Sequence, residues 1–252
     1  MNILITNDDG ISSKGLISLV KAFSKIADVY VVAPEGERSS NSHHLTCFGQ
    51  VKIEKRDVEY ATDAYALWGT PADCVYLGVD FLFKDKIDMV VSGINKGLNV
   101  STDIIYSGTI AAAREAYIHK LPALAVSLES DSIGSFDIAA DYAVMIARKY
   151  YEDEKNTDYF LNLNVPDLKK EDIRGIKICD RVAVLHYDNN LSLFNENGSD
   201  YIRINDVTVT TDYDPDDMRV DYSAIKKGYV SLPPLYNDHF DRAYLKHIEK
   251  LI

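Results

Sequence analysis

Residues 2–10, NILITNDDG, place an apolar run directly before two neighbouring carboxylates. The run at residues 3–6, ILIT, is typical of a buried strand. Asp8 and Asp9 follow it at once, and Gly10 then permits the chain to turn. Like charges repel, and the end of a core strand is a costly place for them. The pair therefore indicates either a bound cation or a simple turn, because Asn, Asp and Gly are also turn formers.

The same segment opens an alternation of strand-like and helix-like stretches that runs through the first two-thirds of the chain. The expected strands are residues 2–6, 29–33, 47–56, 64–68, 88–92, 122–128 and 159–165, and the expected helices are 15–27, 71–83, 108–119 and 136–152. Residues 47–56 and 64–68 alternate more like antiparallel strands. The alternation as a whole favours an α/β fold, with a mostly parallel, Rossmann-like sheet and helices on both faces.

The pattern changes after about residue 170. Residues 176–211 contain short alternating runs, and Asn197-Gly198 is a strong hairpin-turn signal. The predicted divisions are a single α/β domain over 1–252, a hairpin-rich oligomerisation extension over about 176–235, and a C-terminal helix over 239–251.

The composition is that of an acidic globular protein. Its 252 residues carry a formal net charge of -12, which repels phosphate backbones and argues against a nucleic-acid partner. No stretch is long and apolar enough to span a bilayer, and the N-terminus does not resemble a signal peptide. The chain has three cysteines, Cys47, Cys74 and Cys179. Their odd number and wide spacing indicate reduced thiols rather than a disulfide framework. We expect a cytoplasmic protein without a membrane partner.

Three further polar stretches follow or precede predicted elements where an open parallel sheet binds its ligands. Residues 37–42, ERSSNS, follow the second strand, and residues 90–103 bring Asn95 and Asn99 after another. Their amides can serve a cation or an anion. Ser107-Gly108-Thr109 opens a helix, whose free N–H groups favour a phosphate. A solvated loop is the simpler explanation for residues 37–42. The glycines and asparagines of residues 90–103 favour a functional loop, and the two hydroxyls around Gly108 favour an anion site over a helix N-cap alone.

Taken together, these stretches favour metal-assisted hydrolysis of a phosphate ester, in which the cation lowers the pKa of an attacking water. A dinucleotide-binding oxidoreductase and a P-loop NTPase are disfavoured because GxGxxG and GxxxxGK[ST] are absent. An aspartyl-phosphate phosphatase would separate its aspartates by one residue, whereas Asp8 and Asp9 are adjacent. A non-catalytic nucleotide sensor stays open as an alternative.

Seven motifs occur in one order along the chain. They are NILITNDDGISSKG, VVAPEGERSS, GTPADCV, VSGINKGLN, YSGTIAAAREA, LNLNVP and GYVSLPPL. In this the chain resembles the SurE survival-protein family of 5′-nucleotidases. The resemblance implies a divalent-metal-dependent phosphatase acting on nucleoside 5′-monophosphates. A broader phosphomonoesterase that also accepts 3′-nucleotides or polyphosphate is the alternative.

The resemblance also assigns residues, a fold and an assembly. It implies a metal held by Asp8, Asp9, Ser39 and Asn95, with Asp8 and Asp9 catalytic. The residues expected at the substrate are Asn99, Ser107, Gly108 and Thr109. The implied cofactor is one divalent cation, Mg²⁺ or Mn²⁺, with Ca²⁺ a further oxygen-binding ion. The family fold is a three-layer α/β/α sandwich, whose C-terminal β-hairpins exchange between subunits of a homodimer or homotetramer.

Overall fold

The computed structural model of the protein describes residues 1–154 and 156–237. The elements of its first part are β1 (Asn2–Thr6), α1 (Lys14–Phe23), β2 (Asp28–Pro34), β3 (Ile53–Lys55), β4 (Asp63–Leu67), α2 (Pro71–Leu77), η1 (Gly78–Leu82), β5 (Met89–Lys96), α3 (Asp103–Tyr106), α4 (Gly108–Ile118), β6 (Ala123–Leu128), α5 (Phe136–Tyr151) and β7 (Phe160–Val165). Those of the second part are η2 (Lys170–Asp172), β8 (Ile176–Lys177), β9 (Val184–Glu196), β10 (Ser199–Asp212), α6 (Asp221–Lys226), β11 (Val230–Ser231) and β12 (Pro234–Leu235).

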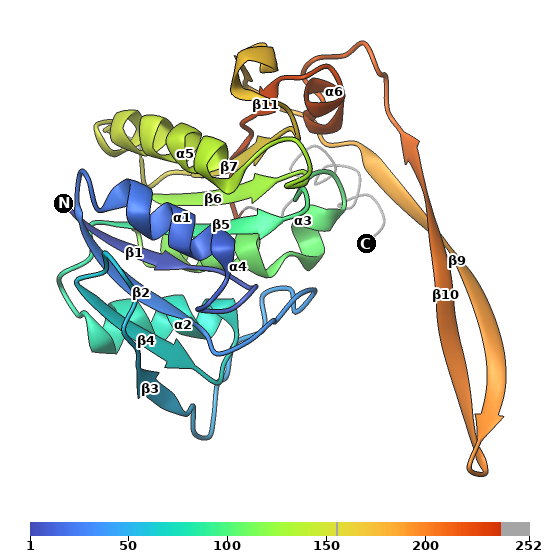
Figure 1. The fold of residues 1–252 in the computed structure, drawn as a ribbon, viewed down its shortest axis with the longest axis horizontal. Helices are drawn as coiled ribbons and strands as arrows, with labels where there is room; N and C mark the ends of the chain where they lie inside the picture. Colours follow the sequence, from blue (N-terminus) through green and yellow to red (C-terminus); the bar gives the residue numbers. More distant parts are fainter. Residues whose placement is uncertain (155, 238–252) are drawn as a thin grey trace, which may run out of the picture.

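A ten-stranded sheet forms the centre of the described chain, in the order β3-β4-β2-β1-β5-β6-β7-β11-β8, with β12 also paired to β7 (Figure 1). The six strands from β4 to β7 pair in parallel. Within this sheet, the described antiparallel pairs are β3–β4, β11–β7 and β12–β7. The predicted α/β fold with a mostly parallel sheet is therefore confirmed.

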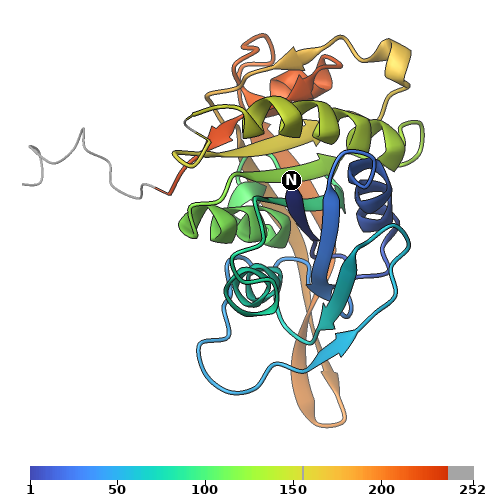
Figure 2. The same cartoon turned by 90° about the vertical axis from the view of Figure 1, so that its left-hand side faces the viewer.

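Strand β1 shows why the sheet is covered on both faces. Successive side chains of a strand point to opposite sides, so Ile3 and Ile5 enter one core cluster and Leu4 enters the other. The first cluster contains apolar residues of α1 and α5, and the second contains residues of α2 and α4. The result is the three-layer arrangement seen from the side in Figure 2.

Gly93 lies at an irregularity within β5. A Cβ at this position would lie 2.3 Å from the carbonyl oxygen of Val126 in β6, and its φ of +139° is left-handed, so only glycine fits. The register between β5 and β6 shifts here, between Ser92 and Asn95. Asn95 therefore sits at the carboxyl end of β5, next to the loop that follows β1.

Two element predictions need correction. Residues 47–56 were expected to form one strand, but only Ile53–Lys55 is a strand, and residues 47–50 are exposed. Their alternation is that of a surface loop that has no core face to bury. The helix predicted at 15–27 ends at Phe23, followed by turns. The helix predicted at 239–251 lies outside the described residues.

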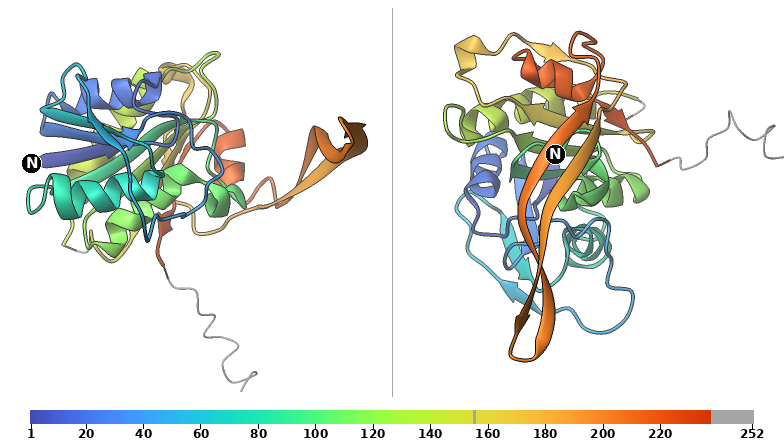
Figure 3. Two further views of the ribbon diagram at one scale, coloured as in Figure 1. Left: turned by 90° about the horizontal axis from the view of Figure 1, so that it is seen from below. Right: turned by 90° about the vertical axis from the view of Figure 1, so that its right-hand side faces the viewer.

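The C-terminal part of the chain contains one long hairpin, where shorter runs were expected. Strands β9 and β10 are paired along their whole length, from Val184 opposite Asp212 to Glu196 opposite Ser199. Asn197 and Gly198 form the connecting turn, as predicted, and both have positive φ. Figures 1 and 3 show this hairpin projecting away from the body. By contrast, β8, β11 and β12 belong to the main sheet, so the projecting part of the chain is residues 184–212.

Among the described residues, no helix combines the length and the apolar character that crossing a membrane requires.

Candidate metal and phosphate site

The turn that carries the two aspartates is shaped by Asn7. Its amide nitrogen donates to the carbonyl oxygen of Gly10 (3.0 Å) and to the hydroxyl of Ser13 (2.7 Å), and its Oδ1 accepts from the Gly10 N–H (3.2 Å). Ser13 in turn caps α1 by accepting from the Leu16 N–H. Because the Asn7 side chain makes the hydrogen bonds that shape the turn, the turn does not depend on the side chains of Asp8 and Asp9. From the sequence, Asn7 was expected only as a turn former beside the pair and was given no further role.

Three other loops meet this turn at the carboxyl edge of the sheet. The Arg38 N–H, from the loop after β2, donates to the Asp8 carbonyl oxygen at 2.7 Å. The backbone of Lys96, at the end of β5, is hydrogen-bonded to the Asp9 carboxylate. A Cβ at Gly108 would lie 2.9 Å from the Asp8 Cβ, so the N-terminus of α4 touches Asp8 directly. The stretches selected from the sequence thus converge on one place.

Burial makes the two carboxylates unfavourable as a bare pair. Desolvation raises the pKa of Asp8, and a hydrogen bond from the Thr109 hydroxyl, 2.6 Å from Asp8 Oδ1, acts in the opposite direction. The pKa of Asp9 is raised to about 6, chiefly by burial and then by the charges of Asp8 and Glu37. A cation at this place would offset the cost of desolvation and the repulsion between negative charges.

Of the two other predicted metal ligands, Ser39 lies on the loop after β2 and Asn95 lies near the carboxyl end of β5. The Ser39 hydroxyl is exposed and donates to Glu37 Oε1 at 2.9 Å. The Asn95 amide nitrogen donates to the Gly97 carbonyl oxygen at 2.9 Å. The atom of Asn95 expected to meet a cation is therefore its carbonyl oxygen.

The donor set determines which cation fits. No group of three or more His, Cys, Asp or Glu side chains comes together as a metal site within the described ranges. The predicted set contains two carboxylates, completed by a hydroxyl and an amide. Such all-oxygen donors suit a hard cation such as Mg²⁺ or Mn²⁺ rather than zinc.

The predicted phosphate residues at the start of α4 have structural duties as well. The Ser107 hydroxyl caps α4 by accepting from the Ile110 N–H at 3.1 Å. Thr109 is fully buried and gives its hydroxyl hydrogen to Asp8, so the structure places it against a carboxylate. Gly108 lies between them. Both hydroxyls thus stand at a helix N-terminus that faces Asp8.

Asn99, the remaining predicted substrate residue, is held by polar side chains buried in the sheet. Asn164 in β7 accepts from the Asn99 N–H (2.8 Å) and donates to its carbonyl oxygen (3.2 Å), and Asn162 donates to the same oxygen (2.8 Å). The Asn99 amide nitrogen donates to Ser127 in β6 (2.8 Å). The sequence signal for this cage was LNLNVP, whose asparagines were quoted as a motif but given no role.

The loop after β2 is tied to the helices around the site. His43 Nε2 lies 2.7 Å from Glu115 Oε2 in α4, and the Ser42 N–H donates to the Tyr106 carbonyl oxygen at 3.0 Å. The Thr70 hydroxyl, at the start of α2, donates to the His44 carbonyl oxygen at 2.6 Å. These contacts fix the loop that carries Ser39.

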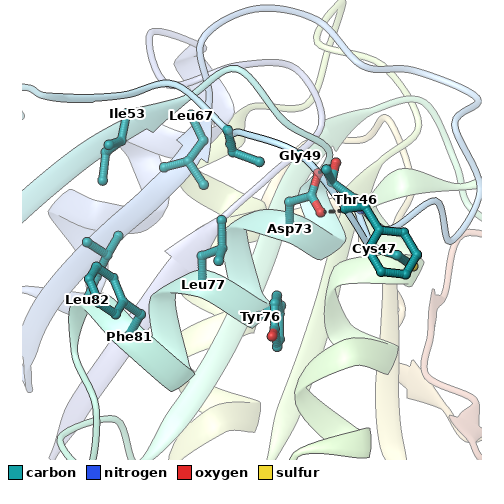
Figure 4. Close-up of a pocket in the computed structure, with 12 residues that line it drawn as sticks. Thr46, Cys47, Gly49, Ile53, Leu67, Asp73, Tyr76, Leu77, Phe81 and Leu82 are labelled. Carbon is teal, nitrogen blue, oxygen red and sulfur yellow. Dashed lines mark hydrogen bonds between the residues drawn. The ribbon is translucent and has the colours of Figure 1, made fainter.

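A separate apolar pocket of about 290 Å³ lies beside this region, between α2, η1 and residues 46–53 (Figure 4). At one end the Thr46 N–H donates to Asp73 Oδ1 at 2.7 Å. Neither Asp8 nor Asp9 is among the described residues that line it. The pocket is therefore a neighbour of the carboxylate site and not part of it.

A parallel sheet whose acidic and amide side chains gather over its carboxyl edge places this chain among the α/β proteins that bind ligands at that edge. The sequence model of the family described as "Survival protein SurE" matches residues 3–187. The chain belongs to the SurE family.

Individual relatives match over the whole length. The 5′-nucleotidase SurE of Clostridium botulinum (strain Kyoto / Type A2) is 40% identical over 255 residues, covering 100% of this chain and 99% of that protein. The 5′-nucleotidase SurE of Thermosipho melanesiensis is 34% identical and covers 99% and 97%. Among solved structures, the SurE protein from Aquifex aeolicus superposes with a TM-score of 0.83, at 34% identity, covering 100% and 99%.

The raised pKa of Asp9 predicts how the stability of the metal-free protein changes with pH. The unfolded chain has the ordinary pKa of 3.8, so between about pH 4 and 6 the folded state binds more protons than the unfolded state. The free energy of unfolding should therefore decrease as pH rises through this window, and less so in Asp9→Asn. Thermal melts of both proteins in chelator check this, and parallel curves would contradict it.

Ser107→Ala separates a phosphate contact from a helix cap. Losing a cap lowers the free energy of unfolding by about 1 kcal/mol, whereas losing a hydrogen bond to a charged group weakens binding by roughly 1.5–3 kcal/mol. We expect both effects in steady-state kinetics and melts. The matched control is Ser135→Ala, which removes the cap of α5 and should lower stability alone. Unchanged kinetics in Ser107→Ala would leave Ser107 as a cap only.

Proposed function

We propose that the protein is a divalent-metal-dependent phosphatase that hydrolyses nucleoside 5′-monophosphates. The observation that carries the proposal is the adjacent pair of a buried Asp8 and a half-buried Asp9 at the sheet edge, with Asp8 packed against the N-terminus of α4. The relatives named above carry the name 5′-nucleotidase over nearly identical lengths. Such a reaction needs an acidic pair that can bind a cation and a helix N-terminus that can bind a phosphate, in contact with each other.

In this proposal one cation, Mg²⁺ or Mn²⁺, would be held by Asp8, Asp9, Ser39 and Asn95. When bound, such an ion supplies Lewis acidity and lowers the pKa of a water molecule. The fit is supported by the oxygen-only donors and by the raised pKa values of both carboxylates. Glu37 adds a further negative charge near the pair and receives the Ser39 hydroxyl.

The remaining residues would bind and orient the phosphate group. The first turn of α4, with Ser107 and Gly108, offers N–H groups and the positive end of the helix dipole. Asn99 would reach the phosphate from the loop after β5, where Asn164 and Asn162 hold its peptide groups. Thr109 would keep Asp8 in place by its hydrogen bond. Donors fixed before the substrate arrives are what stabilises charge in a transition state.

Removing the metal should abolish turnover. Metal-free protein prepared with a chelator is expected to be inactive on a panel of phosphate monoesters, including 5′- and 3′-nucleotides and polyphosphate. Adding Mn²⁺ or Mg²⁺ should restore hydrolysis, with 5′-monophosphates preferred. Full activity after exhaustive chelation would contradict metal dependence, and saturable nucleotide binding without turnover would favour the sensor alternative.

The aspartate variants serve as controls for that experiment. Asp8→Asn and Asp9→Asn each remove one anionic oxygen and keep the shape of the turn, so both should lose turnover and metal-induced stabilisation. Asp137→Asn, on the exposed start of α5, makes the same chemical change at a side chain that no hydrogen bond or ion pair of the described residues joins to the pair, and it should behave as wild type.

We further propose that the β9–β10 hairpin mediates a homodimer or homotetramer. Leu191 faces Ile204 and Leu193 faces Ile202 across the two strands, and all four side chains are more than half exposed. A two-stranded hairpin is marginal in water by itself, and an apolar face on it marks an interaction surface. Exchange of such an element between identical chains closes a symmetric oligomer.

Light scattering at low protein concentration checks the assembly. We expect an oligomer for the wild type, and a smaller species for Leu193→Asp, because a charge on the apolar face opposes its burial. Ser192→Asp places the same charge on the other face of the hairpin and should change the mass less. A wild-type monomer would contradict the assembly.

A reducing compartment such as the cytoplasm is also proposed, supported by Cys47, Cys74 and Cys179, each of which is a free thiol.

A further inference from the structure

A second buried aspartate lies outside the carboxylate site. Asp221, the first residue of α6, is 0% exposed. Its Oδ2 accepts from the Ser101 N–H at 2.8 Å, and its Oδ1 accepts from the Tyr222 N–H at 2.7 Å and the Ala183 N–H at 3.4 Å. Burial raises its pKa, and these backbone hydrogen bonds oppose that shift.

The three donors come from different parts of the fold. Ser101 is two residues after Asn99, and Ala183 directly precedes β9, the first strand of the projecting hairpin. Tyr222 belongs to α6 itself. A single carboxylate thus joins the loop that carries Asn99, the base of the hairpin and a helix. Hydrogen bonds to an ionised group are stronger than neutral ones, so this junction fixes three backbones at once.

The backbone of Ser101 needs such an anchor. Its φ is +60°, a left-handed conformation that a residue other than glycine adopts only when its surroundings hold it there. Asp221 holds Ser101 from α6, while Asn164 and Asn162 hold Asn99 from β7. The segment 99–101 is therefore clamped from two sides.

We propose that Asp221 is a positioning residue for the reaction, which sets the place of Asn99 through Ser101 and connects it to the base of the β9–β10 hairpin. The proposal rests on the function proposed above, because it takes Asn99 as a substrate residue. It follows that anything that displaces the hairpin base also displaces Asn99.

The test compares Asp221→Asn with Asp217→Asn in the Mn²⁺-loaded full-length protein, using a nucleoside 5′-monophosphate. Asp217 also contacts the hairpin base, accepting from Arg181 Nη1 at 2.9 Å, and no contact joins it to Ser101 among the hydrogen bonds of the described residues. We expect kcat/KM to fall about 10²-fold in Asp221→Asn, as displacement of a substrate contact does, and to change less than about twofold in Asp217→Asn.

A double-mutant cycle shows whether Asp221 acts through Asn99. In an Asn99→Ala background, Asp221→Asn should lower kcat/KM little further, because the contact it positions is already gone. Additive losses would overturn the proposal, as would a folded Asp221→Asn variant with kcat/KM within about twofold of wild type. If Asp221→Asn does not fold, Asp221→Glu, which keeps the charge and shifts it by one methylene, takes its place with the same criteria.

Hydrogen exchange followed by mass spectrometry keeps this proposal separate from the proposed function. Peptides covering residues 97–103 should exchange faster in Asp221→Asn than in wild type or Asp217→Asn, whether or not the protein turns over a substrate. If wild type hydrolyses no phosphate monoester, the proposed function fails while the clamp is still measured. If wild type is active and exchange in this segment is unchanged, the Asp221 proposal alone fails.

Discussion

The placing of two adjacent carboxylates at the end of β1, with Asp8 buried and Asp9 half-buried, is the constraint on which the rest of the site depends. Desolvation raises the pKa of Asp8 and of Asp9, and the charge of Asp8 raises that of Asp9 further, so the bare pair opposes its own ionisation. The fold nevertheless packs Gly108 and the Thr109 hydroxyl directly against Asp8. Such an arrangement supports the proposal that the functional protein holds a cation here.

Polar residues buried behind the site hold its loops without taking part in the proposed chemistry. Asn7 shapes the aspartate turn, Asn164 holds the peptide groups of Asn99, and Asp221 holds Ser101. Each buried side chain satisfies backbone groups that would otherwise lie unpaired inside the protein. Rigid loops of this kind position substrate contacts before the substrate arrives, which lowers the entropic part of the barrier.

Local patterns in the sequence predicted the sheet, the aspartate turn and the α4 N-terminus, because strand alternation and helix capping depend on residues close in the chain. They failed where burial is decided elsewhere: residues 47–56 were expected to form one strand, yet residues 47–50 are exposed and only Ile53–Lys55 is a strand. The supports of the site were also beyond such reasoning. Asn99 and Asn164 are 65 residues apart, and Ser101 and Asp221 are 120 apart, so only the folded sheet brings them together.

Calorimetric titration of metal-free protein with Mn²⁺ near pH 6, in buffers of different ionisation enthalpy, tests the central claim most directly. Because the pKa of Asp9 is raised to about 6, part of the protein carries a proton there that a cation must displace. The account predicts saturable binding of one ion per chain with release of protons, and loss of both in Asp8→Asn and Asp9→Asn. Binding that is absent, or that survives both substitutions unchanged, would contradict it.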